Sequence, residues 1–444
     1  MDHVVIIGNG ISGITAARFI RKSSDLKITV ISDEHPYFFS RTALMYVYMG
    51  HMKFSQTQPY ENWFWKKNNI SLIQSRVTSV SPEINKLQLG NGKHISYSKL
   101  IIASGSKYNM LNWPGKDLNG VSGLYHKQDL DHITKLTQNC KNAVIVGGGL
   151  IGIELAEMLL SKDIKVTLVC REKSFWDNAL TDDQSQLINN HIQSHKINLI
   201  LNDTLKSIEG EKGFVESVLL ESGLKIPCEF VGITIGVSPN IDFIKDSGIN
   251  FDKGILVNEY LSTNYSNIYA VGDCAEHLNP PKNRPKIESI WYSGRLMGET
   301  VAKTICGSKS KYKPGHWFNS AKFLDIEYQI YGQVNNTKSI SKDNAQFNWN
   351  NFSKSVSISI QYVKSNYQIT GISSLGIRLR QEVIQNWLDE KKDIHFTIKN
   401  FEKILFDPEF STNYYNPIIK TFNEIFKVNL KPKSNKILSI FNFQ

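Results

Sequence analysis

The chain has 444 residues, which is too long for one ordinary domain and predicts two to four. Hydrophobic residues make up 41% and charged residues 21%, a globular composition that excludes a largely disordered chain. The net charge of +10 would suit an acidic partner, but the lysines are scattered along the chain, so we expect no nucleic-acid ligand.

The five cysteines are widely spaced and form no CxxC or Cys/His zinc pattern. We therefore expect no disulfide framework, no redox dithiol and no metal site. The first residues, MDHVVIIGNGISG, enter a strand at once, without the basic and apolar regions of a signal peptide. No run of 18 apolar residues predicts a membrane span, and we expect a cytoplasmic protein.

The first apolar run, VVII, leads directly into GNGISG and then into a helical pattern and a second strand. This is the arrangement of a dinucleotide-binding βαβ unit. Gly8 permits the tight turn, Gly10 lets the backbone approach a pyrophosphate, and Gly13 allows close packing of helix on strand. Asp33 and Glu34 follow the second strand, where a carboxylate can accept hydrogen bonds from ribose hydroxyls.

A second run, AVIV, precedes GGGLIG and repeats the arrangement with Gly147, Gly149 and Gly152. The strand after the helix ends just before Arg171 and Glu172. A carboxylate at this place favours NADH, and an arginine favours the extra phosphate of NADPH. The residues leave the choice of coenzyme open, and Arg171 could equally be an ordinary exposed cation.

The two units predict an α/β fold with two Rossmann-like domains, the second inserted in the first. Between them the chain looks rich in strands, with a turn at Asn91-Gly92. Pro/Gly punctuation places the first domain at 1–114 and 253–310 and the second at 115–252. Residues 316–444 alternate and then turn helical, which predicts a C-terminal α+β module.

Five motifs occur in order along the chain: GNGISG, LIIASG, GGGLIGIELAE, TIGVSPN and STNYSNIYAVGDCAE. In this set and order the sequence resembles the FAD-dependent pyridine-nucleotide oxidoreductases that have two dinucleotide-binding domains. The resemblance implies a glutathione reductase-type fold, with FAD in the first domain and NAD(P)H in the second. The C-terminal module of related enzymes forms a dimer or partner surface, so a homodimer is possible.

The resemblance also implies particular site residues. Asp273 would bind the ribityl or pyrophosphate region of FAD. Glu154, one turn into the second glycine-rich helix, would lie near the flavin–nicotinamide contact as the catalytic group, although a helix-capping or ion-paired carboxylate is an alternative. The further cofactor contacts that the resemblance implies are at Ser12, Arg41, Val77, Ala103, Ser104, Gly105, Gly236 and Gly272.

The segment ITVISDEHPYFFSRTALMYVYMG resembles rubredoxin reductases and the flavin domain of assimilatory nitrite reductases. Thr42 stands where the peroxidase and coenzyme A disulfide reductase branch has its cysteine, and a threonine cannot serve as a thiolate relay. Disulfide reduction and thiol peroxidase chemistry are therefore disfavoured. Cys274 is expected to fill a small buried site. Met297 replaces a glutamine that contacts the flavin region in the family.

We expect an FAD-dependent NAD(P)H oxidoreductase that passes electrons to a rubredoxin- or ferredoxin-like protein or to another soluble acceptor. Two alternatives remain. One is a peripheral membrane NADH:quinone oxidoreductase, which would use the basic, apolar tail 426–441 at the membrane surface. The other is a non-catalytic flavoprotein that binds NAD(P)H to sense redox state.

Overall fold

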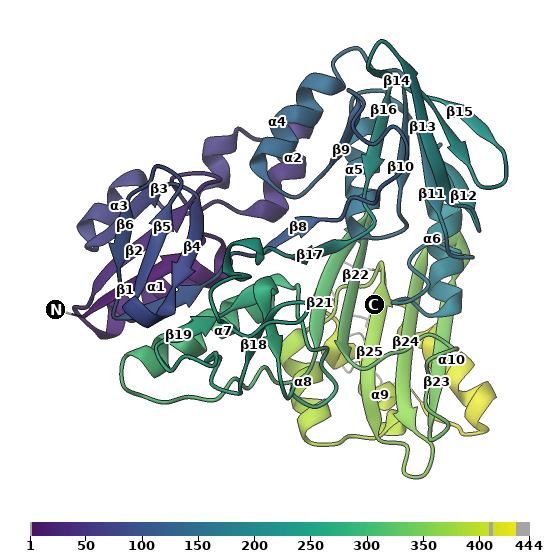
Figure 1. Ribbon diagram of the computed structural model, residues 1–444. Coiled ribbons are helices and arrows are strands. Elements are labelled where there is room, and N and C mark those ends of the chain that lie inside the picture. The colour runs from purple at the N-terminus through teal and green to yellow at the C-terminus, as the bar shows by residue number, and fades with distance from the viewer. Residues whose placement is uncertain (1, 408–411, 432–444) are drawn as a thin grey trace, which may run out of the picture. The chain divides into compact units, whose positions relative to one another are not determined.

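The computed structural model describes residues 2–407 and 412–431 and divides the chain into two compact units. Unit 1 combines the chain up to Arg171 with Lys196–Gly315. Unit 2 combines Glu172–His195 with the chain from His316 onward (Figure 1). Residues 408–411 and 432–444 lie outside the described part of the chain, and with them most of the tail 426–441 that was considered for a membrane surface.

The first sheet of unit 1 is parallel, and its central strands are mostly apolar because both of their faces are buried. Helices α1 (Ile11–Ser23) and α7 (Trp291–Ile305) pack against each other, so closely that a Cβ added to Gly298 would lie 2.5 Å from the Ser12 carbonyl oxygen. Helices α2 (Leu44–Met49) and α3 (Asn62–Lys67) follow the second strand. In spatial order the strands are β19 (Ile268–Ala270), β7 (Lys99–Ile102), β1 (His3–Ile7), β2 (Lys27–Ser32) and β3 (Ile70–Gln74).

A second parallel sheet in unit 1 repeats this plan. Helix α5 (Leu150–Leu160) connects its central strands, and α4 (Lys127–Leu136) precedes them. In spatial order the strands are β12 (Asn198–Leu201), β11 (Lys165–Cys170), β10 (Asn142–Val146), β16 (Phe230–Ile233) and β9 (Val121–Gly123). The two sheets confirm the predicted α/β fold with a duplicated Rossmann-like unit.

Smaller sheets complete unit 1. The hairpin expected around Asn91-Gly92 is present between β5 and β6, and Gly92 has the positive φ of 81° that such a turn favours. The antiparallel sheets are β4 (Val77–Ser81), β5 (Lys86–Leu89) and β6 (His94–Ser96), then β13 (Leu205–Glu211), β14 (Phe214–Leu220) and β15 (Lys225–Pro227), and the pair β8 (Ser106–Tyr108) and β17 (Val237–Pro239). A short parallel pair consists of β18 (Ile255–Val257) and β20 (Ala275–His277).

Unit 2 is an antiparallel sheet with helices, as the alternating and then helical pattern predicted. Its apolar face packs against three helices, α8 (Gln381–Asp389), α9 (Ile394–Lys399) and α10 (Tyr415–Phe426), in a core that includes Ile358, Ile360 and Phe422. In spatial order the strands are β21 (Phe318–Phe323), β22 (Ile326–Gly332), β25 (Ile369–Leu375), β24 (Val356–Val363) and β23 (Asn344–Asn351).

The other face of this sheet is polar and is also buried. Helix α6 (Asp182–Ser194) belongs to the same unit and contacts this face. The side-chain amide nitrogen of Gln184 is 3.1 Å from the Ser373 hydroxyl, and Thr181 and Ser359 lie 3.4 Å apart through their hydroxyls. Hydrogen bonds of this kind offset the cost of burying polar side chains.

Within residues 2–407 and 412–431, no helix combines the length and the apolar character needed to cross a membrane.

Candidate active site

Unit 1 contains a cavity of about 430 Å³, within the size range of small-molecule sites. Its wall is formed by the segments that follow the carboxyl ends of all five strands of the first sheet: Gly8 after β1, Asp33 after β2, Val77 after β3, Ala103 after β7 and Asp273 after β19. In open parallel sheets this edge is where ligands bind. Helix α5 of the second sheet adds Leu150, Ile151 and Glu154 to the same wall.

The structure therefore brings most of the residues expected from the sequence to one cavity. Those that line it are Gly8, Gly10, Ser12, Asp33, Glu34, Arg41, Val77, Ala103, Ser104, Gly105, Glu154 and Asp273. Those that do not line it are Gly13, Gly147, Gly149, Gly152, Arg171, Gly236 and Gly272.

Gly10 and Gly13 have different environments. A Cβ at Gly13 would lie 2.1 Å from the carbonyl oxygen of Gly8, so this glycine is required for packing of α1 on the strand. A Cβ at Gly10 would meet nothing within 4 Å, and its φ of −70° suits any residue. Since neither the backbone nor the packing demands a glycine at position 10, the open space there fits a ligand that approaches the backbone closely.

The glycines of the second βαβ unit, which also belongs to unit 1, differ from one another in the same way. A Cβ at Gly152 would lie 2.4 Å from the Gly147 carbonyl oxygen, whereas one at Gly149 would meet nothing within 4 Å. Gly149 has a φ of −121°, again ordinary extended backbone, and it caps the N-terminus of α5. The free N–H groups of a helix N-terminus favour a phosphate group. Both glycine-rich turns thus have the form of a pyrophosphate cradle.

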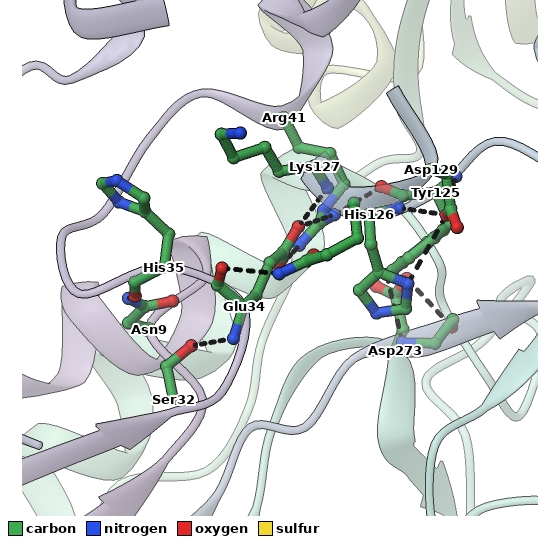
Figure 2. Close-up of polar contacts among 12 residues, drawn as sticks. Asn9, Ser32, Glu34, His35, Arg41, Tyr125, His126, Lys127, Asp129 and Asp273 are labelled. Atoms are coloured by element: carbon green, nitrogen blue, oxygen red, sulfur yellow. Dashed lines mark hydrogen bonds and ion pairs between the residues drawn. The ribbon is translucent and has the colours of Figure 1, made fainter. Parts of the chain in front are cut away.

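An ion pair organises the loop after β2 (Figure 2). Arg41 donates two hydrogen bonds to the Glu34 carboxylate, Nη1 to Oε1 at 2.8 Å and Nη2 to Oε2 at 2.5 Å, and its guanidinium lies 4.5 Å from the centre of the Tyr125 ring. The backbone N–H of Lys127 also donates to Glu34 Oε1 at 2.8 Å. Burial opposes the charge of Arg41, but the Glu34 carboxylate outweighs this effect and raises the pKa of Arg41.

The two acidic residues after β2 are consequently in different situations. The Glu34 carboxylate is committed to Arg41 and to the N-terminus of α4, while Asp33 is exposed and lines the cavity. No hydrogen bond or ion pair within the described residues engages the Asp33 carboxylate. Asp33 thus presents a carboxylate to the cavity, and Glu34 holds Arg41 in place.

Asp273 lies in a short 3₁₀ turn after β19, where its Oδ2 accepts hydrogen bonds from Ser106 Oγ at 3.2 Å and from the Tyr125 hydroxyl at 3.3 Å. Burial raises the pKa of Asp273 above its ordinary value, although these hydrogen bonds and the charge of Arg41 act against that shift. Tyr125, which joins Asp273 to Arg41, was not identified in the sequence because no local pattern marks it.

Glu154 projects into the cavity from the first turns of α5. Burial, and to a smaller extent the charge of Glu157, raise the pKa of Glu154 to about 7. In the described part of the chain, neither an ion pair nor a capping hydrogen bond holds its carboxylate. A carboxyl group that titrates near neutrality inside a cavity is suited to a role in proton or charge balance.

The cysteine thiols are absent from the cavity wall, although Cys274 directly follows Asp273 in the chain. Thr42 lines the cavity and no cysteine does. None of the five cysteines forms a disulfide, and Cys274 is fully buried with its sulfur 3.4 Å from the carbonyl oxygens of Ile102 and Val271. Burial raises the pKa of the Cys274 thiol, which disfavours the reactive thiolate.

Two residues of α7 have different positions, one at the cavity and one in the core. Trp291 lines the cavity at the start of α7 and is partly exposed to solvent. Met297 is fully buried, and its sulfur accepts a hydrogen bond of 3.2 Å from the Gly272 N–H. Met297 therefore supports the turn before Asp273.

The chain belongs to the pyridine nucleotide-disulphide oxidoreductase family, which matches residues 2–294. The NADH-rubredoxin oxidoreductase of Clostridium acetobutylicum is 32% identical over 313 residues, covering 70% of this chain and 76% of the relative. The nitrite reductase [NAD(P)H] of Bacillus subtilis is 29% identical over 342 residues, which cover 76% of this chain. The chain spans only 41% of the length of that enzyme.

Solved structures extend the similarity of fold over nearly the whole chain. The water-forming NADH oxidase from Lactobacillus brevis has a TM-score of 0.81 at 18% identity and covers 96% of this chain and 100% of its own. Family, fold and cavity together define an oxidoreductase with sites for FAD and NAD(P)H.

Proposed function

We propose that the chain takes electrons from NAD(P)H into an FAD held in the cavity and passes them to a small redox protein. The observation that supports this most strongly is the pair of cradles at Gly10 and Gly149, where glycine serves neither the backbone nor the packing. One cradle lies on the cavity wall, and the other begins the helix that brings Glu154 to that wall.

The roles of the residues follow from their positions. In this proposal Gly8, Gly10 and Ser12 receive the FAD pyrophosphate, Asp33 receives the ribose, and Asp273 binds the ribityl or pyrophosphate region. Val77 and the Ala103–Gly105 turn line the remaining cavity. The FAD-binding domain would comprise 1–114 and 253–310, and the NAD(P)H-binding domain 115–252.

The second cradle, at Gly147, Gly149 and Gly152, would receive NAD(P)H, with Gly236 beside it and Arg171 near the adenosine ribose. Bound FAD would supply the two-electron chemistry, taking hydride from the nicotinamide and releasing electrons one at a time. Glu154 would hold negative charge at the place where the nicotinamide gains positive charge.

An acceptor is required because a flavin reduced by NAD(P)H must lose two electrons before it can react again. The cavity wall has Thr42 and no cysteine, so it offers no thiol as an intermediate electron carrier. The exposed side of α7 fits an acidic protein. From Trp291 at the cavity, the exposed side chains Tyr292 and Leu296 lead along the helix to Lys303. Lys303, Lys311 and Lys313 line a depression beside α7, together with the single carboxylate of Glu299. This surface, α7 with the three lysines, is termed the lysine surface below.

The test is turnover of the purified flavoprotein with NADH and NADPH against three acceptors: a rubredoxin, a ferredoxin, and a quinone in lipid vesicles. We expect turnover with an iron protein that weakens as salt is raised, since salt screens exposed charges. Turnover with the quinone alone would instead support a role at the membrane surface. Absence of turnover with every acceptor would favour a sensor, and either result would contradict the proposal. We further propose that the protein acts in the cytoplasm.

A further inference from the structure

Three potential metal ligands gather in unit 2. His191 lies in the last turn of α6, His195 caps the C-terminus of this helix, and Asp325 lies in the tight turn between β21 and β22. One ligand atom from each residue lies within 4.8 Å of the other two. No local sequence pattern indicates this cluster, because Asp325 follows His191 by 134 positions.

The helix presents both imidazoles on one side, because residues four apart on a helix are neighbours. Their ring centres are 4.4 Å apart. His191 Nε2 is 2.5 Å from Asp325 Oδ1, and His195 Nε2 is 3.5 Å from the same oxygen. Two atoms bound to one tetrahedral zinc ion at about 2.0–2.2 Å lie roughly 3.3 Å apart, so only small side-chain movements are needed.

The tautomer of His195 suits a metal ligand. Its Nδ1 is 3.0 Å from the backbone carbonyl oxygen of His191, which can only accept a hydrogen bond, so Nδ1 bears the proton. The lone pair is then on Nε2, the atom that faces Asp325. A hydrogen bond from the second ring nitrogen to a carbonyl is the usual support of a metal-bound histidine.

We propose that His191, His195 and Asp325 form a site for a divalent transition-metal ion such as Zn²⁺. Two imidazoles and a carboxylate are ligands that Zn²⁺ accepts, whereas Mg²⁺ and Ca²⁺ prefer oxygen ligands only. Water can fill a fourth position, because His195 and Asp325 are both accessible. The ion would connect the end of α6 to the β21–β22 hairpin and so stabilise unit 2.

Unit 2 offers a matched control. His316 Nε2 is 2.9 Å from Asp389 Oδ1, and the two side chains are 34% and 72% exposed, the same values as for His195 and Asp325. This pair has no second histidine in a three-ligand cluster within the described residues. His316→Ala therefore removes an equally exposed imidazole from a histidine–aspartate pair without touching the proposed site.

The experiment is calorimetric titration of the untagged, metal-free flavoprotein with ZnCl₂, using wild type, His195→Ala, Asp325→Asn and His316→Ala. We expect one zinc site in wild type and in His316→Ala. It should weaken at least about tenfold in His195→Ala and in Asp325→Asn, since each loses a ligand. Equal zinc affinity in all four proteins, or no site in wild type, would overturn the proposal.

Thermal unfolding gives a second measurement that does not depend on enzyme activity. Zinc should raise the melting temperature of wild type and His316→Ala but not of His195→Ala, because a ligand that binds only the folded state stabilises it. Both substituted site residues are accessible at the surface, so folding without zinc should be retained. Stabilisation of His195→Ala to the wild-type extent would contradict the assignment.

Discussion

Asp273 combines burial with a carboxylate that the neighbouring side chains only partly satisfy through Ser106 and Tyr125. We expect Asp273→Ala to weaken FAD binding about ten- to a hundredfold, since a hydrogen bond to a charged acceptor contributes roughly 1.5–3 kcal/mol. The flavin-to-protein ratio after dialysis measures this. Asp117→Ala, which removes an exposed aspartate, should retain its FAD. Full flavin occupancy in dialysed Asp273→Ala would contradict the assigned role.

Glu154 gives a prediction about stability and pH. Its pKa is about 7 in the folded chain against an ordinary value of 4.5, so the unfolded chain loses this proton first as the pH rises. The contribution of Glu154 to stability is complete below pH 4.5 and is lost as the pH rises through 7. Glutamine stays neutral, so Glu154→Gln should raise the melting temperature at pH 8 and leave it unchanged near pH 4.5. An equal change at both pH values would be inconsistent with this shift.

The same carboxyl group should shape the pH profile of the reaction. An ionised carboxylate favours positive charge nearby. The rate of flavin reduction by NAD(P)H in wild type should therefore rise severalfold as the pH passes through about 7. Stopped-flow measurement on Glu154→Gln should show a flat profile over this range. A wild-type inflection that persists in the variant would assign the titration to another group.

Cys274 should be replaceable, because its thiol is buried and absent from the cavity wall. We expect Cys274→Ser to keep its turnover within about twofold, since an inert thiol contributes packing and not chemistry. Steady-state kinetics with a one-electron acceptor measures this. An inactive variant that still binds FAD would place a cysteine in the electron path.

The glycine-rich turns allow a matched pair of substitutions on one helix. Gly149→Val should abolish reduction by NAD(P)H and leave the flavin spectrum intact, because the added side chain enters the space left for a pyrophosphate and meets no protein atom within 4 Å at its Cβ. Gly152→Ala should instead lower the melting temperature, since its Cβ would lie 2.4 Å from the Gly147 carbonyl oxygen. Reduction of Gly149→Val at the wild-type rate would exclude this turn as the nicotinamide site.

Elements with a strong local pattern could be predicted from the sequence, and those fixed by distant contacts could not. Both βαβ units follow from an apolar run, a glycine-rich turn and a helical pattern. The alternation in β24 predicted a strand, but its polar residues Ser357 and Ser359 are buried too. Nothing near them in the sequence indicates that α6, more than 150 residues earlier, contributes Thr181 and Gln184 to that polar layer.

The candidate site shows the same limit. The cradle glycines, Asp33 and Asp273 could be found because they belong to motifs with fixed spacing. Tyr125 could not, since it acts through contacts with Arg41 and Asp273, which lie 84 and 148 positions away. The sequence also could not show that Glu34 is ion-paired while Asp33 is not. This difference depends on the contact between Arg41 and Glu34, which only the structure reveals.

At the scale of the whole molecule, the lysine surface predicts how the protein recognises its acceptor. The double change Lys303→Glu and Lys313→Glu should raise the KM for an acidic acceptor protein about tenfold or more and leave reduction by NAD(P)H unchanged, because charge complementarity acts on association. Lys206→Glu with Lys212→Glu changes the net charge equally at exposed positions on and beside β13 and should have little effect. Equal effects of both pairs would contradict a local docking surface.

The most direct measurement is anaerobic titration of the purified protein with NADH and with NADPH while the visible spectrum is recorded. We predict bound FAD whose absorbance bands bleach fully after about one equivalent of the effective coenzyme, since no thiol lines the cavity to take up further electrons. No long-wavelength absorbance band from thiolate-to-flavin charge transfer should be present before the coenzyme is added. The cavity is lined by Thr42 and by no cysteine. A colourless protein that FAD cannot reconstitute, or two equivalents consumed per flavin, would contradict it.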